Sequence, residues 1–106
     1  MKTKIRKFKE TDLETVLDID REFPPTSRGL ITKDDAVRLS KQSPKTCLVA
    51  EKGGKVIGFI FGELGEDSCV VRFLQVLPEY LGEGIVTDLI DEVEKLTNAR
   101  VLLKGK

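Results

Sequence analysis

The clearest amphipathic pattern of the chain lies in its second half. Residues 85–96 carry apolar side chains every three to four positions, with polar and acidic side chains between them. That spacing predicts a helix with one apolar face. Residues 70–77 before it are mostly apolar and predict a strand. Because Pro78 and two glycines, Gly82 and Gly84, separate these segments, the sequence predicts a strand, a glycine-bearing turn and a helix in direct succession.

The first half of the chain predicts one strand and two helices. Residues 4–8 alternate apolar and charged side chains, as a half-exposed strand does. The Thr-x-x-Glu sequence that starts at Thr11 has the form of a capping box, so we expect a helix from there to about Phe23, before a pair of prolines. A second helix is expected to start at Thr32, which has an acid, Asp35, three residues on.

Two further strands are predicted at residues 46–51 and 56–64, because a Gly-Gly pair between them is typical of a hairpin turn. Gly58 and Gly62 lie inside the second of these strands and predict a bulge or a close backbone approach. A short last strand is expected at residues 100–103. The pattern as a whole predicts an α/β fold.

Length and composition narrow the class of protein. A chain of 106 residues fits one domain, which we place at residues 1–106. Its 34% charged and 40% hydrophobic residues are typical of a globular protein. Apolar runs are too short to span a bilayer and no signal peptide is visible, so we expect a cytoplasmic protein without a membrane partner. Lysine plus arginine equal aspartate plus glutamate at 18 each, so no nucleic-acid partner is expected.

The chain contains no histidine and two cysteines, Cys47 and Cys69. Without histidine it has no Ser-His or Cys-His nucleophile pair and no histidine-ligated metal, and we expect no metal site. The two cysteines lack metal-ligand spacing and are expected to be buried, reduced thiols.

The turn between residues 77 and 85 has the arrangement of an anion site. Unpaired backbone N–H groups and the helix dipole converge where a glycine turn enters a helix. The alternative is a connection that only packs.

Residues 76–86, with the sequence Val-Leu-Pro-Glu-Tyr-Leu-Gly-Glu-Gly-Ile-Val, resemble the acetyl-CoA signature of the GNAT N-acetyltransferase family. The resemblance extends over residues 3–103 through the order of predicted elements. The arginine or glutamine of the family falls on Leu81, and its final glycine or alanine falls on Val86. The resemblance implies a GNAT-like, mixed and mostly antiparallel sheet flanked by helices, truncated after the fifth strand.

The same resemblance implies acetyl-CoA as co-substrate and assigns two groups of cofactor-binding residues. The pantetheine arm is expected along a strand and the pyrophosphate at the turn. The strand residues are Leu74, Gln75 and Val76, and the turn residues are Leu81, Gly82, Glu83, Gly84, Ile85 and Val86. Leu81 lacks the charged hydrogen bonds of an arginine, and Glu83 adds a negative charge beside the phosphates. The alternative is an inactive module that binds acyl-CoA weakly or binds only a partner protein.

No catalytic residue follows from the sequence. The carboxylates that we considered as acceptors of the amine proton belong to the hairpin region and are Glu51, Glu63, Glu66 and Asp67. Tyr80, the single tyrosine, is expected to pack behind the turn.

The resemblance also bears on partners. In the family, the region between the first strand and the hairpin shapes the acceptor side, and its compactness here favours an amine of a small molecule or a peptide. Family members continue beyond the fifth strand, so we expect an exposed sheet edge at residues 101–103 and a homodimer that covers it. The alternative is a second chain that supplies the missing part.

Overall fold

The computed structural model describes residues 3–22 and 31–103, and in this part the chain forms one five-stranded sheet. The strands are β1 (Thr3–Lys7), β2 (Cys47–Lys52), β3 (Lys55–Leu64), β4 (Ser68–Val76) and β5 (Arg100–Leu103). They lie in the order of the sequence; β1 to β4 pair antiparallel, and β5 pairs with β4 in parallel. The α/β class and the mixed, mostly antiparallel sheet are therefore confirmed.

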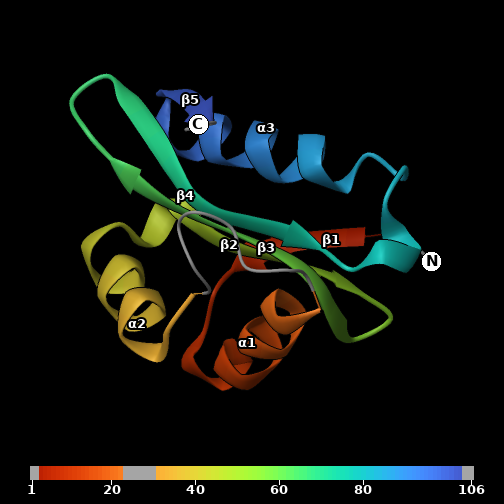
Figure 1. Cartoon of the computed structure of the whole chain (residues 1–106). Helices are drawn as coiled ribbons and strands as arrows, with labels where there is room; N and C mark the ends of the chain where they lie inside the picture. The colour runs from red at the N-terminus through yellow and green to blue at the C-terminus, as the bar shows by residue number, and fades with distance from the viewer. Residues whose placement is uncertain (1–2, 23–30, 104–106) are drawn as a thin grey trace.

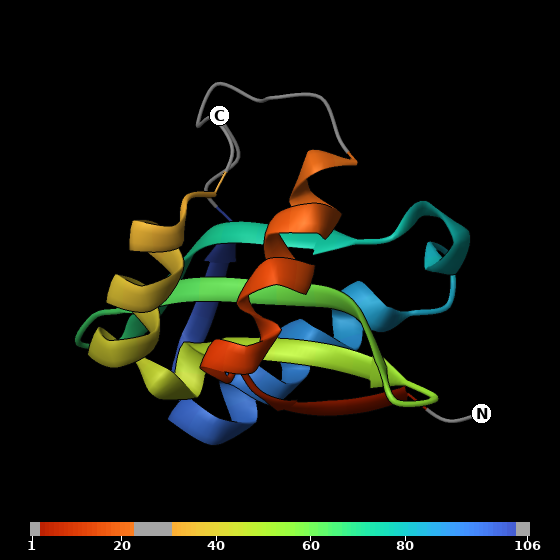
Figure 2. The same cartoon turned by 90° about the horizontal axis from the view of Figure 1, so that it is seen from below.

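Three α-helices of the described residues cover the two faces of this sheet. Helices α1 (Leu13–Arg21) and α2 (Lys33–Gln42) lie on one face and α3 (Ile85–Thr97) lies on the other (Figures 1 and 2). None of the helices within residues 3–22 and 31–103 is long and apolar enough to cross a membrane.

Each face of the sheet has its own hydrophobic core, because successive side chains of a strand point to opposite faces and the central strands β2 and β3 are apolar on both. On the side of α1 and α2, the core contains Phe59 and Phe61 of β3, whose rings are 5.7 Å apart between centroids. On the side of α3, it contains Ile57, Ile60 and residues of α3 such as Leu89. The helical stripe predicted at residues 85–96 is thus the buried face of α3.

The glycines of β3 allow close approach, as predicted. A Cβ atom added to Gly62 would lie 2.6 Å from Sγ of Cys69, and one added to Gly58 would lie 3.0 Å from the carbonyl oxygen of Gln75. The ladder between β3 and β4 also shifts by one residue: Phe61 pairs with Phe73, whereas Gly62 pairs with Val71. This β-bulge leaves one extra residue on β4 and changes the direction of its side chains.

The two predicted helix starts have different outcomes. At α2 the capping box is confirmed, since Oγ1 of Thr32 accepts the amide of Asp35 at 3.0 Å and the Thr32 amide donates to the Asp35 carboxylate at 3.2 Å. The capping box at Thr11 is wrong. The carboxylate of Asp12 instead accepts the Lys9 amide at 2.8 Å, and α1 begins at Leu13. The predicted helix end near Phe23 lies outside the described residues.

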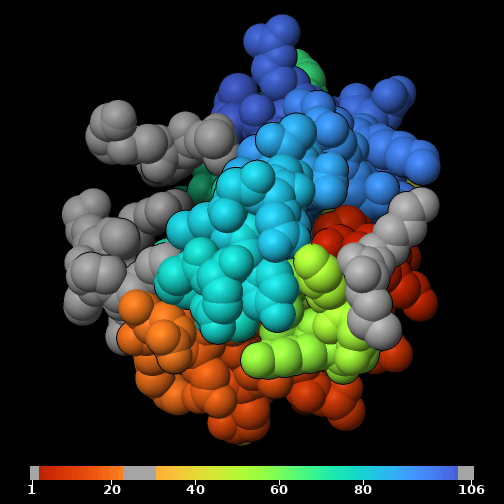
Figure 3. Space-filling model, turned by 90° about the vertical axis from the view of Figure 1, so that its right-hand side faces the viewer, coloured from red at the N-terminus to blue at the C-terminus, as the bar shows by residue number. Residues whose placement is uncertain are grey.

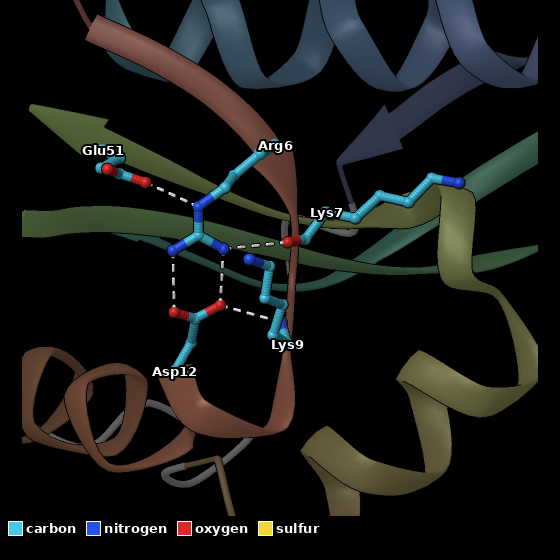
Figure 4. A network of polar contacts seen from close by, with 5 residues as sticks. All are labelled: Arg6, Lys7, Lys9, Asp12 and Glu51. Carbon is cyan, nitrogen blue, oxygen red and sulfur yellow. Dashed lines mark hydrogen bonds and ion pairs between the residues drawn. The ribbon is translucent and has the colours of Figure 1, made fainter. Parts of the chain in front are cut away.

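Asp12 has this role because a strand residue holds it. The guanidinium of Arg6 on β1 donates to both oxygens of Asp12 at 2.8 and 2.9 Å, and its Nε donates to Glu51 of β2 at 2.6 Å (Figure 4). Burial raises the pKa of the Asp12 carboxyl, but the hydrogen bonds from Arg6 and from the Lys9 amide outweigh it, and the net pKa lies below its usual range. The network ties β1, β2 and the start of α1 together.

Both cysteines are free and buried, as predicted. Burial raises the pKa of the Cys47 thiol to about 12 and also raises that of Cys69.

Candidate functional site

The candidate site begins at the part of β4 that has no strand beside it on one side. β5 pairs only with the first part of β4, from Ser68 to Val71, so within the described residues the outer edge of β4 from residue 72 to 76 is unpaired. We call this the open edge. A strand edge of this kind presents N–H and C=O groups that an extended ligand can pair with.

The pairing of β4 with β3 determines which backbone groups face the open edge. The Leu77 amide donates to the Ile57 carbonyl at 2.9 Å, toward β3. Because hydrogen-bonding directions alternate along an antiparallel strand, the backbone of Gln75 also faces β3, and that of Leu74 and Val76 faces outward. Of the three strand residues predicted to bind the cofactor, two therefore offer backbone groups to the open edge.

After β4 the chain makes a short 3-10 turn, Pro78–Tyr80, and then the segment 81–84, which we call the glycine loop. Gly82 and Gly84 have φ values of 90° and 80°, in the left-handed region that favours glycine. A Cβ atom added to either of them would meet no atom within 4 Å. The backbone of the loop is thus open to a ligand.

The glycine loop leads directly into α3, whose N-cap is Gly84. No side chain within the described residues caps this helix start, so the first amides of α3 lack both an intrahelical acceptor and a capping oxygen there. The positive end of the helix dipole points to the same place. The arrangement attracts an anion.

A cavity of about 250 Å³ lies at this junction. It is lined by Val76, Tyr80, Leu81, Gly82, Gly84, Ile85, Val86 and Thr87. Six of the nine predicted cofactor-binding residues are among them, while Leu74, Gln75 and Glu83 are not. Tyr80 packs against the core on the α3 side, as predicted, and its contribution to the cavity wall was not predicted, nor was that of Thr87.

Glu83 forms an ion pair with Lys52 that no pattern in the sequence predicts. Its Oε1 is 2.9 Å from Nζ of Lys52, at the end of β2, and the same Nζ lies 5.3 Å from the centroid of the Tyr80 ring. The negative charge expected beside the phosphates is therefore balanced within the protein. The two residues are 31 positions apart, and the pairing of β2, β3 and β4 in the sheet brings them together.

A second hollow, of about 260 Å³, lies between α2 and β4 and is lined by Asp35, Arg38, Leu39, Arg72 and Phe73. Arg72 and Phe73 reach it because the β-bulge lies at this point of β4. Two ion pairs border it, Arg38 with Asp35 and Arg72 with Glu63, each at 3.1 Å. We call it the α2 hollow.

The four carboxylates proposed as proton acceptors do not form one cluster: Glu51 lies on β2, Glu63 on β3, and Glu66 and Asp67 in the β3–β4 turn. The hydrogen bond from Arg6 lowers the pKa of Glu51, which makes that carboxylate a weak base. Glu66 and Asp67 are exposed in the β3–β4 turn, at the end of β4 opposite to the glycine loop. Glu63 is the one that borders the α2 hollow through its pair with Arg72.

Known proteins resemble this chain over most of its length. The model of the Acetyltransferase (GNAT) family matches residues 13–103. An acetyltransferase of Photorhabdus laumondii is 33% identical over 96 residues, which are 91% of this chain and 67% of that protein.

Solved structures share the fold at lower identity. Ard1 from Thermoplasma volcanium matches with a TM-score of 0.82 at 22% identity, over 97% of this chain and 71% of that one. Arabidopsis thaliana Naa50, solved in complex with the bisubstrate analogue CoA-Ac-MVNAL, matches with a TM-score of 0.78 at 15% identity, over 97% of this chain and 72% of that one. Since the family model covers most of the chain, and the Photorhabdus relative agrees with it, the chain belongs to the GNAT family of acetyltransferases.

Proposed function

We propose that the protein binds acetyl-CoA along the open edge of β4 and at the glycine loop, and transfers the acetyl group to an amine of a small molecule or a peptide. The observation that carries the proposal is the uncapped start of α3 behind two glycines, directly beside an unpaired strand edge. These two features suit the two chemically different halves of one ligand, a diphosphate and an amide-containing chain.

The residues present fit this co-substrate. Leu74 and Val76 offer outward-facing backbone groups, which suit the amides of a pantetheine arm. The loop backbone and the first amides of α3 suit the diphosphate, and the space beside Gly82 and Gly84 leaves room for it. Bound acetyl-CoA would supply a thioester, which an amine converts into an amide while coenzyme A leaves as a thiol.

The α2 hollow is the acceptor side in this proposal. It contains Arg72 and Phe73, which lie on the same strand as the open edge but reach the α1 and α2 face of the sheet. The acceptor amine and the acetyl group would thus approach β4 from different sides. Solved relatives carry a ligand of matching chemistry, as the bisubstrate analogue on Naa50 illustrates.

Calorimetric titration with acetyl-CoA tests the binding half of the proposal. We expect wild-type binding in the micromolar range and a loss of at least about tenfold for Gly84→Ala, whose Cβ enters the space beside the loop. Gly54→Ala is the matched control: its φ of 81° imposes the same backbone strain, and its surroundings are equally open. That variant should lose similar stability and keep its affinity.

The transfer half is tested by incubating the protein and acetyl-CoA with amino acids, polyamines and short peptides, and by measuring product masses. An acetylated amine supports the proposal. Absence of wild-type binding up to millimolar acetyl-CoA overturns it and favours the second candidate, an inactive module that binds a partner protein. The apolar Leu81, 55% exposed on the loop, is the observation that favours that candidate. The cytoplasmic location expected from the sequence stays a prediction.

A further inference from the structure

The β2–β3 hairpin brings a cation to the rim of the candidate site. Lys52 is the last residue of β2, and its Nζ contacts both the Glu83 carboxylate, at 2.9 Å, and the face of the Tyr80 ring, at 5.3 Å from the centroid. The hairpin and the glycine loop lie side by side on this face of the molecule (Figure 3).

Among the described residues, none that lines the cavity has a cationic side chain. Its eight lining residues are apolar, glycine, tyrosine or threonine, and Leu81 stands where the family signature has arginine or glutamine. A diphosphate bound there would be held by backbone amides, without a charged hydrogen bond from the lining. Lys52 contacts Tyr80, which lines the cavity, and Glu83, which lies in the glycine loop. It is therefore placed to donate a charged hydrogen bond to the diphosphate.

We propose that Lys52 binds a phosphate group of the acyl-CoA, and that Glu83 holds it in position until the ligand arrives. The carboxylate then acts as an internal substitute for the phosphate, and Lys52 exchanges one anion for the other. This inference rests on the proposed function, and it adds to it a residue from outside the signature segment that replaces the missing cation at Leu81.

The physical cost of such an exchange is small. The Lys52 and Glu83 side chains are 25% and 43% exposed, and ion pairs at that exposure contribute little to stability. The lysine ammonium stands on a flexible stem and can turn without movement of the hairpin. The diphosphate taken as a whole, like the 3′-phosphate monoester, carries more negative charge than the single Glu83 carboxylate, so the exchange favours the ligand.

A rival explanation is that the Lys52–Glu83 pair only fastens the loop to the hairpin. The two explanations predict opposite changes in ligand affinity when the charge of Glu83 is removed. If the pair is a fastener, removal of either charge loosens the loop, and both single variants bind more weakly. If Lys52 changes partners, removal of Glu83 frees the lysine and deletes a repulsive charge, so that variant binds more tightly.

The experiment is calorimetric titration of coenzyme A into the full chain and its variants at two salt concentrations. We expect Lys52→Met to weaken binding about tenfold, with a shallower salt dependence, and Lys52→Arg to retain most of the affinity. Glu83→Gln should tighten binding by about threefold, since one repulsive charge is lost. Lys55→Met is the matched control, because Lys55 is the cross-strand neighbour of Lys52 in the hairpin and forms no ion pair within the described residues. It should change affinity by less than about twofold.

Dephospho-coenzyme A, which lacks the 3′-phosphate, identifies the phosphate involved. An equal effect of Lys52→Met on both ligands assigns the contact to the diphosphate, and an effect on coenzyme A only assigns it to the 3′-phosphate.

Failure of the inference and failure of the proposed function are distinguishable. Absence of binding by the wild-type chain overturns both. Wild-type binding that Lys52→Met leaves unchanged, or that Glu83→Gln weakens as much as Lys52→Met does, overturns this inference and leaves the proposed function standing.

Discussion

At the scale of single residues, the fold depends on contacts that leave no room for an added methyl group. Gly62 is the clearest case, because its Cα faces the thiol of Cys69 across the bulged ladder between β3 and β4. The thiol and the glycine thus pack directly against each other, so the effect of a substitution at either position on stability depends on the side chain at the other.

We predict that Gly62→Ala lowers the free energy of unfolding by about 2 kcal/mol, because the new Cβ would overlap Sγ of Cys69 at 2.6 Å. Urea denaturation measures it. The double variant Gly62→Ala/Cys69→Ala should lose well less stability than the sum of the losses of the two single variants, because the smaller side chain at position 69 leaves room for the new methyl group. Gly65→Ala is the control, since its Cβ would be 3.4 Å from the nearest atom. Equal losses for the two glycine variants would contradict the explanation.

Leu81 offers a residue-scale prediction about affinity. Leu81→Arg restores the cation that the family signature has at this position, and we expect it to tighten coenzyme A binding by about tenfold through charge-assisted hydrogen bonds. The side chain is 55% exposed, so the fold should tolerate the change. Leu64→Arg adds the same charge at a similarly exposed position, at the end of β3 away from the loop, and should leave the titration unaltered. An equal gain in coenzyme A affinity for both variants would mean that the added positive charge acts through net charge and not through a contact at position 81.

At the scale of elements, local sequence patterns predicted the helices, turns and caps that are determined by residues close together in the chain. The spacing of apolar residues in α3, the Gly-Gly turn and the cap at Thr32 all act within a few positions of the chain, and all are confirmed. The start of α1 was predicted wrongly because Arg6, on β1, holds Asp12 and moves the cap away from Thr11. A tertiary contact overrode a local signal.

The candidate site also has a part that local sequence predicts and a part that depends on tertiary contacts. The glycine loop carries a signature in consecutive residues, so six of the eight residues that line the cavity were named from the sequence as cofactor-binding, and that role stays a prediction. The ion pair of Lys52 with Glu83 and the bulge that turns Arg72 into the α2 hollow depend on the register of the sheet. No spacing within a single segment reports that register.

The Arg6 network gives an element-scale prediction. Arg6→Met should destabilise the protein by about 2 kcal/mol at pH 7, because it leaves the Asp12 carboxylate, 7% exposed, without its cation. Since Arg6 and the Lys9 amide lower the pKa of Asp12 in the folded state, their contribution is present above the unfolded pKa of about 4 and is lost as the pH falls through the folded value.

The difference between Arg6→Met and wild type should therefore narrow below about pH 4. Urea unfolding curves recorded at about every pH unit between pH 3 and 7 measure this difference in the free energy of unfolding. Arg21→Met removes the cation of an exposed pair with Asp18 and should cost less than about 0.5 kcal/mol at every pH. A constant difference across the pH range would exclude the titration of Asp12 as the cause.

At the scale of the whole molecule, the proposed function assigns a different ligand to each face of the sheet. The α3 side carries the glycine loop and its cavity, and the α1 and α2 side carries the hollow proposed for the acceptor. β4 belongs to both sides, since its outer edge from residue 72 to 76 is unpaired within the described residues and its bulge faces α2. Transfer across one strand would let a single sheet hold two different ligands.

The homodimer expected from the sequence stays a prediction. Leu102 on β5 is 43% exposed, at the edge where we expect two copies to meet. Light scattering at about 0.1 mM, well above the dissociation constant of a micromolar interface, should give twice the mass of the chain. Leu102→Lys should then shift the mass toward that of one chain, and a monomer for the wild type would exclude the dimer at this concentration.

The burial of both thiols has a practical consequence for the reaction. Acetyl transfer from acetyl-CoA releases one free thiol per turnover, and aromatic disulfide reagents that develop colour detect such thiols through the thiolate form. In the folded protein Cys47 and Cys69 are shielded from solvent, and their raised pKa values keep them protonated. The folded protein would therefore contribute almost no colour of its own, so that a continuous optical assay of the proposed transfer reports only the released coenzyme A. The same protein in denaturant exposes both thiols and calibrates the assay.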